Sequence, residues 1–306
     1  MKVSKELRDD KGGLLEYFRA RGEEYLEEIT KQYGASEYKE RAAKSNKAMI
    51  EARENLITIL RHKAEEEKWE SKDLLENILM IYYTNYIVML ECRNKVWQYD
   101  YMTFSRRIGE IWEPFCKLPF YYPTNKISLF VPPTFRDVKK KLSNEIERYI
   151  NGLYLSTKQK KELLQYYNKV WTLVTSGEIK LELDLHFVYQ NKKYVADLKS
   201  GFNSNEKGNT NRLLLVAAIY RNLEDNYQTM MFVRSKEDEN NHYLKTLEKS
   251  GIWQVFCGED VYSKINDYTG YNLKSWINKN INWEEDITKD FYDYLKTNKL
   301  INYLKW

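Results

Sequence analysis

Residues 181–199 alternate between apolar and polar side chains, and this alternation constrains the fold more than any other feature of the sequence. From Leu181 to Phe187 every second residue is large and apolar, and the alternation returns from Tyr194 to Lys199. A period of two is typical of β-strands, whose successive side chains point to opposite faces of a sheet. The polar stretch 190–193 separates the two runs, so the sequence predicts a β-hairpin.

The register of this hairpin decides which side chains meet. With Asn191-Lys192 as a two-residue loop, Asp184 lies opposite Lys199 and His186 lies opposite Asp197. Asp184, Asp197 and Lys199 then share one face of the hairpin. The other face holds Leu183, Leu185, Ala196 and Leu198. Directly opposed Cβ atoms are about 5 Å apart and diagonal ones roughly 7–8 Å apart, so the carboxylates of Asp184 and Asp197 can reach one shared ion.

Two carboxylates and a lysine on one face predict a site for a hard divalent cation that acts on phosphate. Mg²⁺ prefers oxygen ligands and retains several waters, so one or two carboxylates can hold it against a phosphate group. The ion polarises a phosphoryl oxygen and lowers the pKa of a bound water. Lys199 can stabilise the charge that develops around the phosphorus, or orient the attacking water. The backbone carbonyl of Leu198, between the second acid and the lysine, is a further candidate ligand.

The pattern resembles the PD-(D/E)xK nuclease superfamily, with Asp184 as the first acid and Asp197-Leu198-Lys199 as the D-x-K element. Within that superfamily it is similar to type II restriction endonucleases, in which such a hairpin is followed by Ser-Gly, here Ser200-Gly201. The resemblance covers about residues 176–267 and departs from the family pattern at Leu183, which stands where proline is usual. It implies Mg²⁺-dependent hydrolysis of both strands of duplex DNA in a restriction–modification system, leaving 5′-phosphate and 3′-hydroxyl ends.

Some members of the superfamily use a glutamate from an upstream helix as an additional metal ligand. Glu162, in a predicted helix that leads toward the hairpin, is the better placed candidate. Glu178 also precedes the hairpin, and Glu182 lies within its first predicted strand. The sequence leaves the choice among these three open.

An acid-x-Lys triplet alone carries little information in a chain in which 31% of the residues are charged. Other triplets of this kind begin at Glu37, Glu66, Glu70, Asp137 and Glu178. The triplet at Asp197 differs from these because it lies in a predicted hairpin with an in-phase acid upstream. The alternative interpretation is an ordinary surface hairpin in which Asp184 and Lys199 form a cross-strand ion pair.

The residues after the hairpin predict a polar loop followed by alternating helices and strands. The loop spans 202–212, an apolar helix 213–220, and two strands 228–234 and 252–257, with a helix near 241–249 between them. Two strands followed by helix, strand, helix and strand form a mixed sheet with helices packed on it. The predicted fold class is therefore α/β (α+β), with the core order that the resemblance implies.

Polar side chains in residues 200–212 are candidates for DNA contact, because amides and guanidinium groups pair with base edges and phosphates. These candidates are Ser200, Asn203, Asn205, Lys207, Asn209, Asn211 and Arg212. A second basic group, Arg136 with Lys139, Lys140 and Lys141, could follow phosphates. The alternatives are an asparagine-rich linker for the first group and an ordinary solvated helix face for the second.

All five prolines fall between residues 114 and 133 and divide the chain. Because proline removes a backbone donor and fixes φ, residues 113–133 are predicted to be extended or turn-like. Helical periodicity covers 14–33, 36–68 and 72–98 before them. After them, residues 134–141 open a helix that runs toward Leu153, and Ser156 caps another helix over 159–174. We expect a mainly helical region over residues 1–133, for DNA recognition or dimerisation, and a nuclease core with a C-terminal helical extension over 134–306.

Composition limits the remaining possibilities. A hydrophobic fraction of 42% can fill a sizeable core, and a net charge of only +4 means that DNA binding must rely on local clusters. Three cysteines, odd in number and far apart, suggest buried free thiols in a reducing cytosol. The N-terminal residues do not resemble a secretory signal, and the apolar run 78–90 is too short to span a bilayer. We expect a cytoplasmic, prokaryotic protein without membrane contact.

Three functional classes remain open. The first is a type II restriction endonuclease, for which a homodimer suits a two-fold symmetric DNA target. The second is another nuclease of the superfamily, such as a repair exonuclease, a resolvase or a transposon end-cleaving protein. The third is a DNA-binding module without catalysis. Residues 211–221 contain no glutamine, whereas RecB-like exonucleases carry Gln-x-x-x-Tyr after the lysine strand, and the intact Asp/Asp/Lys set argues against the third class.

Overall fold

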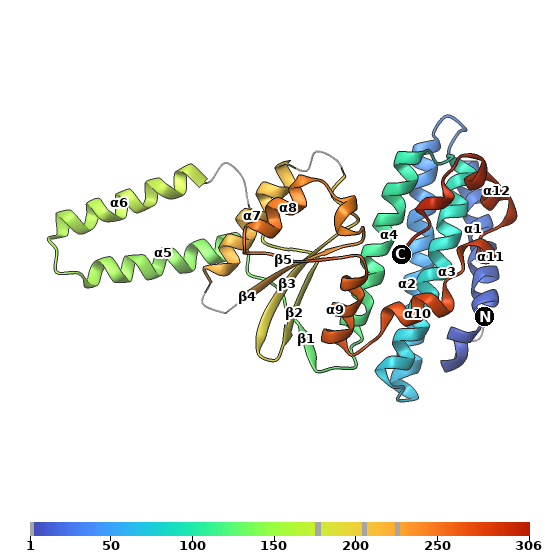
Figure 1. Cartoon of the computed structure of the whole chain (residues 1–306), viewed down its shortest axis with the longest axis horizontal. Coiled ribbons are helices and arrows are strands. Elements are labelled where there is room, and N and C mark those ends of the chain that lie inside the picture. Colours follow the sequence, from blue (N-terminus) through green and yellow to red (C-terminus); the bar gives the residue numbers. More distant parts are fainter. Residues whose placement is uncertain (1–2, 175–178, 204–206, 224–226) are drawn as a thin grey trace.

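A computed structural model of the chain describes residues 3–174, 179–203, 207–223 and 227–306. In these residues one five-stranded sheet lies at the centre, with strand order β1-β2-β3-β4-β5 and helices on both faces (Figure 1). The strands are β1 (Ile127–Leu129), β2 (Leu185–Tyr189), β3 (Lys192–Lys199), β4 (Tyr227–Val233) and β5 (Gln254–Cys257). β1, β2 and β3 pair antiparallel, whereas β3, β4 and β5 pair parallel. The mixed sheet and the α+β class predicted from the sequence are confirmed.

The N-terminal region is helical, as predicted. A short 3-10 helix, η1 (Lys5–Asp9), precedes α1 (Lys11–Gln32), α2 (Tyr38–Glu66) and α3 (Ser71–Val96). Each of these three long helices lies within a few residues of its predicted range. They pack side by side at one end of the molecule (Figure 1), and α3 is buried along most of its length. The 3.6-residue period of their apolar side chains was therefore a sufficient signal.

The prediction that residues 113–133 are extended is wrong for its first part, because α4 (Tyr101–Tyr121) contains Pro114 and Pro119. An interior proline costs a helix about 3 kcal/mol. Here the helix begins at a capping box of Asp100 and Thr103 and buries a long apolar face between the sheet and the helical end (Figure 1). That face includes Ile108, Ile111, Trp112, Phe115, Cys116, Leu118 and Phe120. Each large buried side chain contributes roughly 1.5–3 kcal/mol, which together outweighs both prolines.

Helices α5 (Phe135–Gly152) and α6 (Thr157–Val174) form an antiparallel hairpin that extends away from the sheet, on the side opposite α1–α3 (Figure 1). Thr134 caps α5, and Ser156 caps the start of α6, as predicted, where its hydroxyl oxygen accepts the Gln159 N–H at 3.4 Å. We call residues 135–174 the α5–α6 arm.

The remaining helices cover the two faces of the sheet. α7 (Lys207–Arg221) and α8 (His242–Lys249) pack on the face that carries Val195 and Met231. α4 and α9 (Glu259–Thr269) pack on the face that carries Leu198 and Phe232. The rest of the described chain contains η2 (Glu237–Glu239), α10 (Leu273–Asn280), α11 (Trp283–Asp286), α12 (Lys289–Thr297) and η3 (Ile301–Tyr303).

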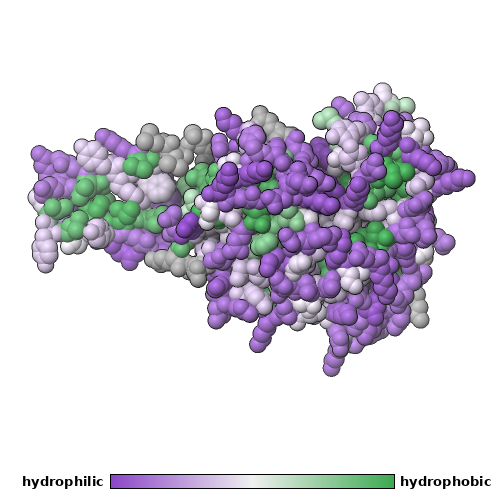
Figure 2. All heavy atoms as spheres, viewed as in Figure 1, coloured by the Kyte–Doolittle hydropathy of each residue, from purple (hydrophilic) through white to green (hydrophobic). Residues whose placement is uncertain are grey.

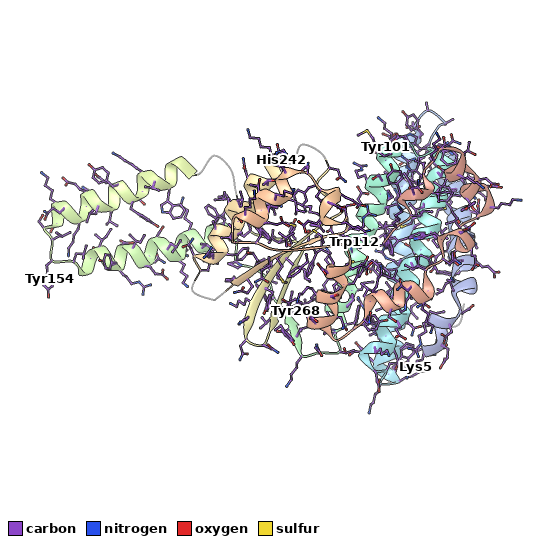
Figure 3. All side chains as sticks on the ribbon, in the orientation of Figure 1. Lys5, Tyr101, Trp112, Tyr154, His242 and Tyr268 are labelled. Carbon is purple, nitrogen blue, oxygen red and sulfur yellow. The ribbon has the colours of Figure 1, made fainter. Side chains whose placement is uncertain are left out.

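The larger hydrophobic core runs without a break from the N-terminal helices to the sheet. It joins Leu14 of α1 and Met49 of α2 to Phe187 of β2 and Leu295 of α12. The labelled Trp112 of α4 lies between the sheet and the helical end (Figure 3), and its indole N–H donates to the Tyr262 hydroxyl. The division into residues 1–133 and 134–306 stays a prediction, and the two parts share this core.

The three cysteines are free thiols: Cys92 and Cys116 are buried, whereas Cys257 is half-buried. None of the helices in the described ranges combines the length and the apolar character needed to cross a bilayer.

Candidate active site

The turn of the β2–β3 hairpin consists of Gln190 and Asn191, one residue earlier than predicted. Both have positive φ, 48° and 60°, as a two-residue type I′ turn requires. Tyr189 pairs with Lys192, and Phe187 pairs with Tyr194. The rings of this second pair stack at 5.0 Å with planes 9° apart, which stabilises the register.

This register brings the two acids together more directly than predicted. The strand pairing ends with Leu185 and Ala196, and the same register continued by one position gives Asp197, not Lys199, as the partner of Asp184. The error of one residue in the position of the turn therefore shifted the predicted partner of Asp184 by two residues. Because side chains alternate with a period of two, Asp184, Asp197 and Lys199 still belong to one face.

The first predicted strand begins too early, since β2 starts at Leu185 and the chain bends at Asp184. The bend separates the leucines that were predicted to share a face. Leu181 and Leu183 pack with α7 in the smaller core, whereas Leu185 packs in the larger core on the opposite side of the sheet. Leu183 was therefore assigned to the wrong face. Its backbone N–H donates to His186 Nε2 at 3.2 Å, so it takes no part in strand pairing.

The bend gives the Asp184 carboxylate a structural role at the end of β3. β2 begins only at Leu185, so Leu198 has no strand partner on this side. Its N–H donates instead to Asp184 Oδ2 at 2.8 Å. On the other side, the Lys199 carbonyl accepts from the Arg234 N–H at 2.9 Å. Backbone groups of successive residues in a strand point in opposite directions, so the Leu198 carbonyl faces the Asp184 side. It accepts from Lys199 Nζ at 3.3 Å, which places this carbonyl and both acids around one ammonium group.

Asp197 is the most deeply buried charged group of the cluster, with 2% of its surface exposed. Lys199 Nζ lies 2.6 Å from Asp197 Oδ2 and 3.9 Å from Asp184 Oδ2, and Arg212 Nη2 lies 3.7 Å from Asp197 Oδ1. Burial, opposed by the nearby Lys199, raises the pKa of Asp197 to about 6. Burial also acts against the Lys199 ammonium, but the carboxylates of Asp197, Asp184 and Glu113 raise the pKa of Lys199 above its ordinary value. Lys199 is therefore a cation at neutral pH.

A third carboxylate, from Glu113 on α4, lies close enough to Asp184 and Lys199 to interact with them electrostatically, and it was not predicted. Burial and the negative charge of Asp184 raise the pKa of Glu113, and Lys117 one turn away pairs with it at 3.1 Å. Gly109, one turn before Glu113, allows α4 to approach the end of β3, because a Cβ there would lie 2.6 Å from Ser200 Cβ. Gly109 and Glu113 are four residues apart, a spacing that places them on one face of a helix. The helix itself was not predicted because the sequence contains prolines there.

Of the predicted upstream glutamates, Glu162 and Glu182 lie within the described residues and do not join the cluster. Glu162 is exposed on α6, on the arm that extends away from the sheet, so its selection as an additional metal ligand is not supported by its position. Glu182 is exposed, and its negative charge adds to the effect of burial that raises the pKa of Tyr220 on α7. Glu178 lies outside the described residues.

His186 is buried on the hairpin and is not available as a base. Its Nε2 accepts the Leu183 N–H, which requires the neutral imidazole. Burial lowers the pKa of His186 to about 4, and Lys117 adds to this, while Asp184 opposes it.

The predicted DNA-binding residues occupy two different environments. The Ser200 hydroxyl accepts two N–H groups from Arg234, at 3.1 and 2.8 Å, and Asn203 is exposed after β3. The predicted loop is shorter than expected because α7 begins at Lys207, so Lys207, Asn209, Asn211 and Arg212 lie on its first turns. Asn205 lies outside the described residues. Of this set, Arg212 is the residue that reaches the acids.

The donor set of this cluster fits a hard cation such as Mg²⁺. Asp184 and Asp197 offer carboxylate oxygens, the Leu198 carbonyl faces the same side, and Glu113 is nearby. Within the described ranges, no three Asp, Glu, His or Cys side chains converge closely enough to enclose an ion alone. A cation here would complete its shell with the carbonyl, water and a phosphate oxygen, as Mg²⁺ commonly does.

The arrangement combines oxygen ligands, a fixed ammonium group and a guanidinium group at the end of a buried strand. A scan against models of known protein families, a search of curated proteins and a search of solved structures each found no match. The chemistry of these side chains is therefore the basis on which a function is assigned.

Proposed function

We propose that this protein is a Mg²⁺-dependent endonuclease that hydrolyses phosphodiester bonds of double-stranded DNA, as type II restriction endonucleases do. One observation carries the proposal: the carboxylates of Asp184 and Asp197 both lie beside the Lys199 ammonium, with an oxygen of each 3.9 and 2.6 Å from Nζ. Such a group is costly to bury, and a catalytic role in phosphoryl chemistry accounts for that cost.

The surrounding topology supports the same proposal. The hairpin β2–β3 leads through α7 to the parallel strand β4 and through α8 to β5, and the acids lie where β2 begins and β3 approaches its end. This agrees with the order of strands and helices that the resemblance to PD-(D/E)xK nucleases implies. The D-x-K element Asp197-Leu198-Lys199 falls within β3, as the resemblance requires.

Asp184, Asp197 and the Leu198 carbonyl would hold the cation, with Glu113 as a further oxygen ligand directly or through water. When bound, Mg²⁺ supplies positive charge beside the phosphate and makes a coordinated water more acidic. Asp197 must lose its proton to act as a ligand, and its pKa of about 6 allows this at neutral pH.

Lys199 acts as a cation in this proposal. Its raised pKa means that it does not accept a proton from water, so its role is to stabilise the negative charge that develops on the phosphoryl oxygens. Arg212, 39% exposed and 3.7 Å from Asp197, can turn toward a phosphate and orient it. Water attacks phosphorus, the bond to the 3′ oxygen breaks, and that oxygen takes a proton, which leaves 5′-phosphate and 3′-hydroxyl ends.

The other classes lead to different products, so a plasmid digest separates them. The purified protein is incubated with supercoiled plasmid and Mg²⁺, and with EDTA as the control. Discrete bands support a site-specific endonuclease, whereas a smear indicates another nuclease of the same superfamily. Absence of cutting over a wide range of plasmid sequences, with DNA still bound, would identify a DNA-binding module and overturn the proposal.

A further inference from the structure

The α5–α6 arm takes no part in the cluster of acids, and none of the other helices in the described part of the chain packs along its outer half (Figure 1). Each of its helices has 18 residues, which corresponds to about 27 Å at 1.5 Å per residue. The labelled Tyr154 marks its far tip (Figure 3). A projection of this length contributes little to the hydrophobic core, so we expect it to contact another molecule.

The arm carries the positive charge of the protein. Residues 135–174 contain nine Lys and Arg against four Asp and Glu, whereas the whole chain has 49 and 45. The excess on the arm is therefore larger than the net charge of +4 of the whole chain, and the rest of the chain is close to neutral. The exposed basic residues are Arg136, Lys140, Lys141, Arg148, Lys158, Lys161 and Lys169.

Tyrosines stand among these basic residues. Tyr149, Tyr154 and Tyr166 are 70%, 106% and 65% exposed. An exposed tyrosine can place its ring against a sugar or a base and donate its hydroxyl proton to a phosphate. Basic residues interleaved with exposed rings are what a nucleic-acid backbone requires of a protein surface.

Apolar side chains on the arm offer a competing explanation. Leu163 and Val170 of α6 are 40% and 57% exposed on the same stripe as Tyr166, and apolar residues form a patch on the arm in Figure 2. An apolar patch can mark a contact with a second copy of the chain. Two arms packed together, however, would oppose two positive surfaces, and the remainder of the chain, with 40 Lys and Arg against 41 Asp and Glu, is close to neutral and offers little compensating negative charge. Charge complementarity therefore favours a polyanion.

We propose that the α5–α6 arm binds the DNA backbone away from the phosphate that is cleaved. The identity of the polyanion rests on the proposed function, which places duplex DNA at Asp184 and Asp197. The arm would contribute affinity that depends on salt and not on base sequence, and it would take no part in the chemical step.

The test compares two triple variants that remove equal charge. The arm variant is Lys140→Gln, Lys158→Gln and Lys161→Gln, and the control is Lys31→Gln, Lys39→Gln and Lys44→Gln on α1 and α2. All six lysines are exposed, and glutamine keeps a helix propensity close to that of lysine. Binding to a fluorescent duplex of about 40 bp, which spans roughly 136 Å at 3.4 Å per base pair, is measured by anisotropy with Ca²⁺ over a range of salt.

Each phosphate that the arm no longer neutralises should reduce the slope of log K against log salt by about 0.9. We expect the slope of the arm variant to fall by about 2–3 and its affinity at low salt to fall at least about tenfold, with the control unchanged. An equal slope for parent and arm variant would overturn the proposal. A parent that sediments as a dimer and an arm variant that sediments as a monomer, at equal slope, would assign the arm to a second copy instead.

The two proposals fail separately because this binding assay needs no cleavage. If the parent cuts plasmid and the arm variant keeps the full salt slope, the endonuclease proposal stands and the proposal for the arm is wrong. If the parent never cuts plasmid but its DNA binding depends on the arm, the proposal for the arm stands and the endonuclease proposal is wrong.

Discussion

At the scale of single residues, Asp197 and Lys199 are the side chains whose burial is hardest to explain by structure alone. In a buried carboxylate and ammonium pair, the Coulombic attraction is about as large as the free energy lost on desolvation, so the pair contributes little to stability. Asp197→Ala and Lys199→Ala should each reduce the rate of plasmid cleavage by at least about 10²–10³, because each removes charge placed for the transition state. Gel shifts with Ca²⁺ should show that both variants still bind DNA, since affinity depends on the wider contact surface.

Glu66→Ala is the matched control for these variants, because Glu66 also begins an acid-x-Lys triplet but is exposed at the end of α2. It should cut at the parent rate. A parent-like rate for Asp197→Ala, or loss of activity in Glu66→Ala, would show that the site is placed wrongly.

Glu113 allows a separate prediction about the cation. Glu113→Gln removes a charge near Asp184 while keeping the size of the side chain, so the variant should need more Mg²⁺ to reach half its maximal rate, by about 10–100-fold. Glu110→Gln, one turn earlier and exposed, removes the same charge from the same helix and should leave the Mg²⁺ requirement unchanged. Equal Mg²⁺ titrations for both variants would remove Glu113 from the site.

His186 should make the stability of the protein depend on pH. Burial lowers its pKa from 6.5 to about 4, so between these values the unfolded chain binds a proton that the folded protein does not. The free energy of unfolding should therefore decrease as the pH falls from about 6.5 to about 4, by roughly 3 kcal/mol from this residue. Asp197, with its raised pKa, acts in the opposite direction, but it is present in every protein compared.

Urea unfolding in EDTA at several pH values isolates this effect. His186→Gln keeps a hydrogen-bond acceptor and should lose the stated dependence, whereas His62→Gln, exposed on α2, should behave as the parent does. A His186→Gln curve parallel to that of the parent would contradict the assignment.

The sequence predicted that Asp184, Asp197 and Lys199 share a face but not that Glu113 lies near them, for a physical reason. Asp197 and Lys199 share a face because they are two residues apart, and a register error of two residues, an even number, leaves Asp184 on that same face. Glu113 reaches the site only through the packing of α4 against β3, which is a contact between elements distant in the sequence. No local pattern contains that contact.

At the scale of elements, the close approach of α4 to β3 depends on Gly109. An added methyl would lie 2.6 Å from Ser200 Cβ and Oγ, so Gly109→Ala must displace either α4 or the residue that follows Lys199. We expect it to lower the free energy of unfolding by about 1–3 kcal/mol and to slow cleavage. Gly12→Ala in α1, where a Cβ would meet nothing within 4 Å, should instead stabilise the protein by up to about 1 kcal/mol.

Thermal unfolding and plasmid cleavage check both variants. A Gly109→Ala protein as stable and active as the parent would show that α4 can move away from β3 without consequence, and Glu113 would then have no fixed position.

Helices with long apolar stripes were predicted well, while α4 was not, because interior prolines are normally decisive against a helix. In α4 the large buried side chains supply more stability than two prolines remove, and that balance depends on the neighbouring helices and sheet. The helices of the arm were predicted from their caps, but their projection from the sheet was not, since periodicity gives no direction in space.

At the scale of the whole molecule, one core joins the helical end to the sheet, so the site between α4 and β3 forms only when both are folded. The described residues contain one cluster of Asp184, Asp197 and Lys199. The two strands of duplex DNA run in opposite directions, so one site cannot meet both in the same orientation. Two copies related by a two-fold axis can, which is the reason to expect a homodimer on DNA.

Mixed dimers test this expectation. Parent protein is mixed with excess Lys199→Ala, allowed to exchange subunits, and incubated with plasmid and Mg²⁺. If each copy cuts one strand, dimers with one inactive copy should nick the plasmid, and the main product should change from linear to open circular as the inactive variant increases. The same excess of the active control Glu66→Ala should leave linear DNA as the product. If linear DNA remains the main product at every ratio and only its rate of formation falls, each copy cuts both strands by itself, and the homodimer is not the active form.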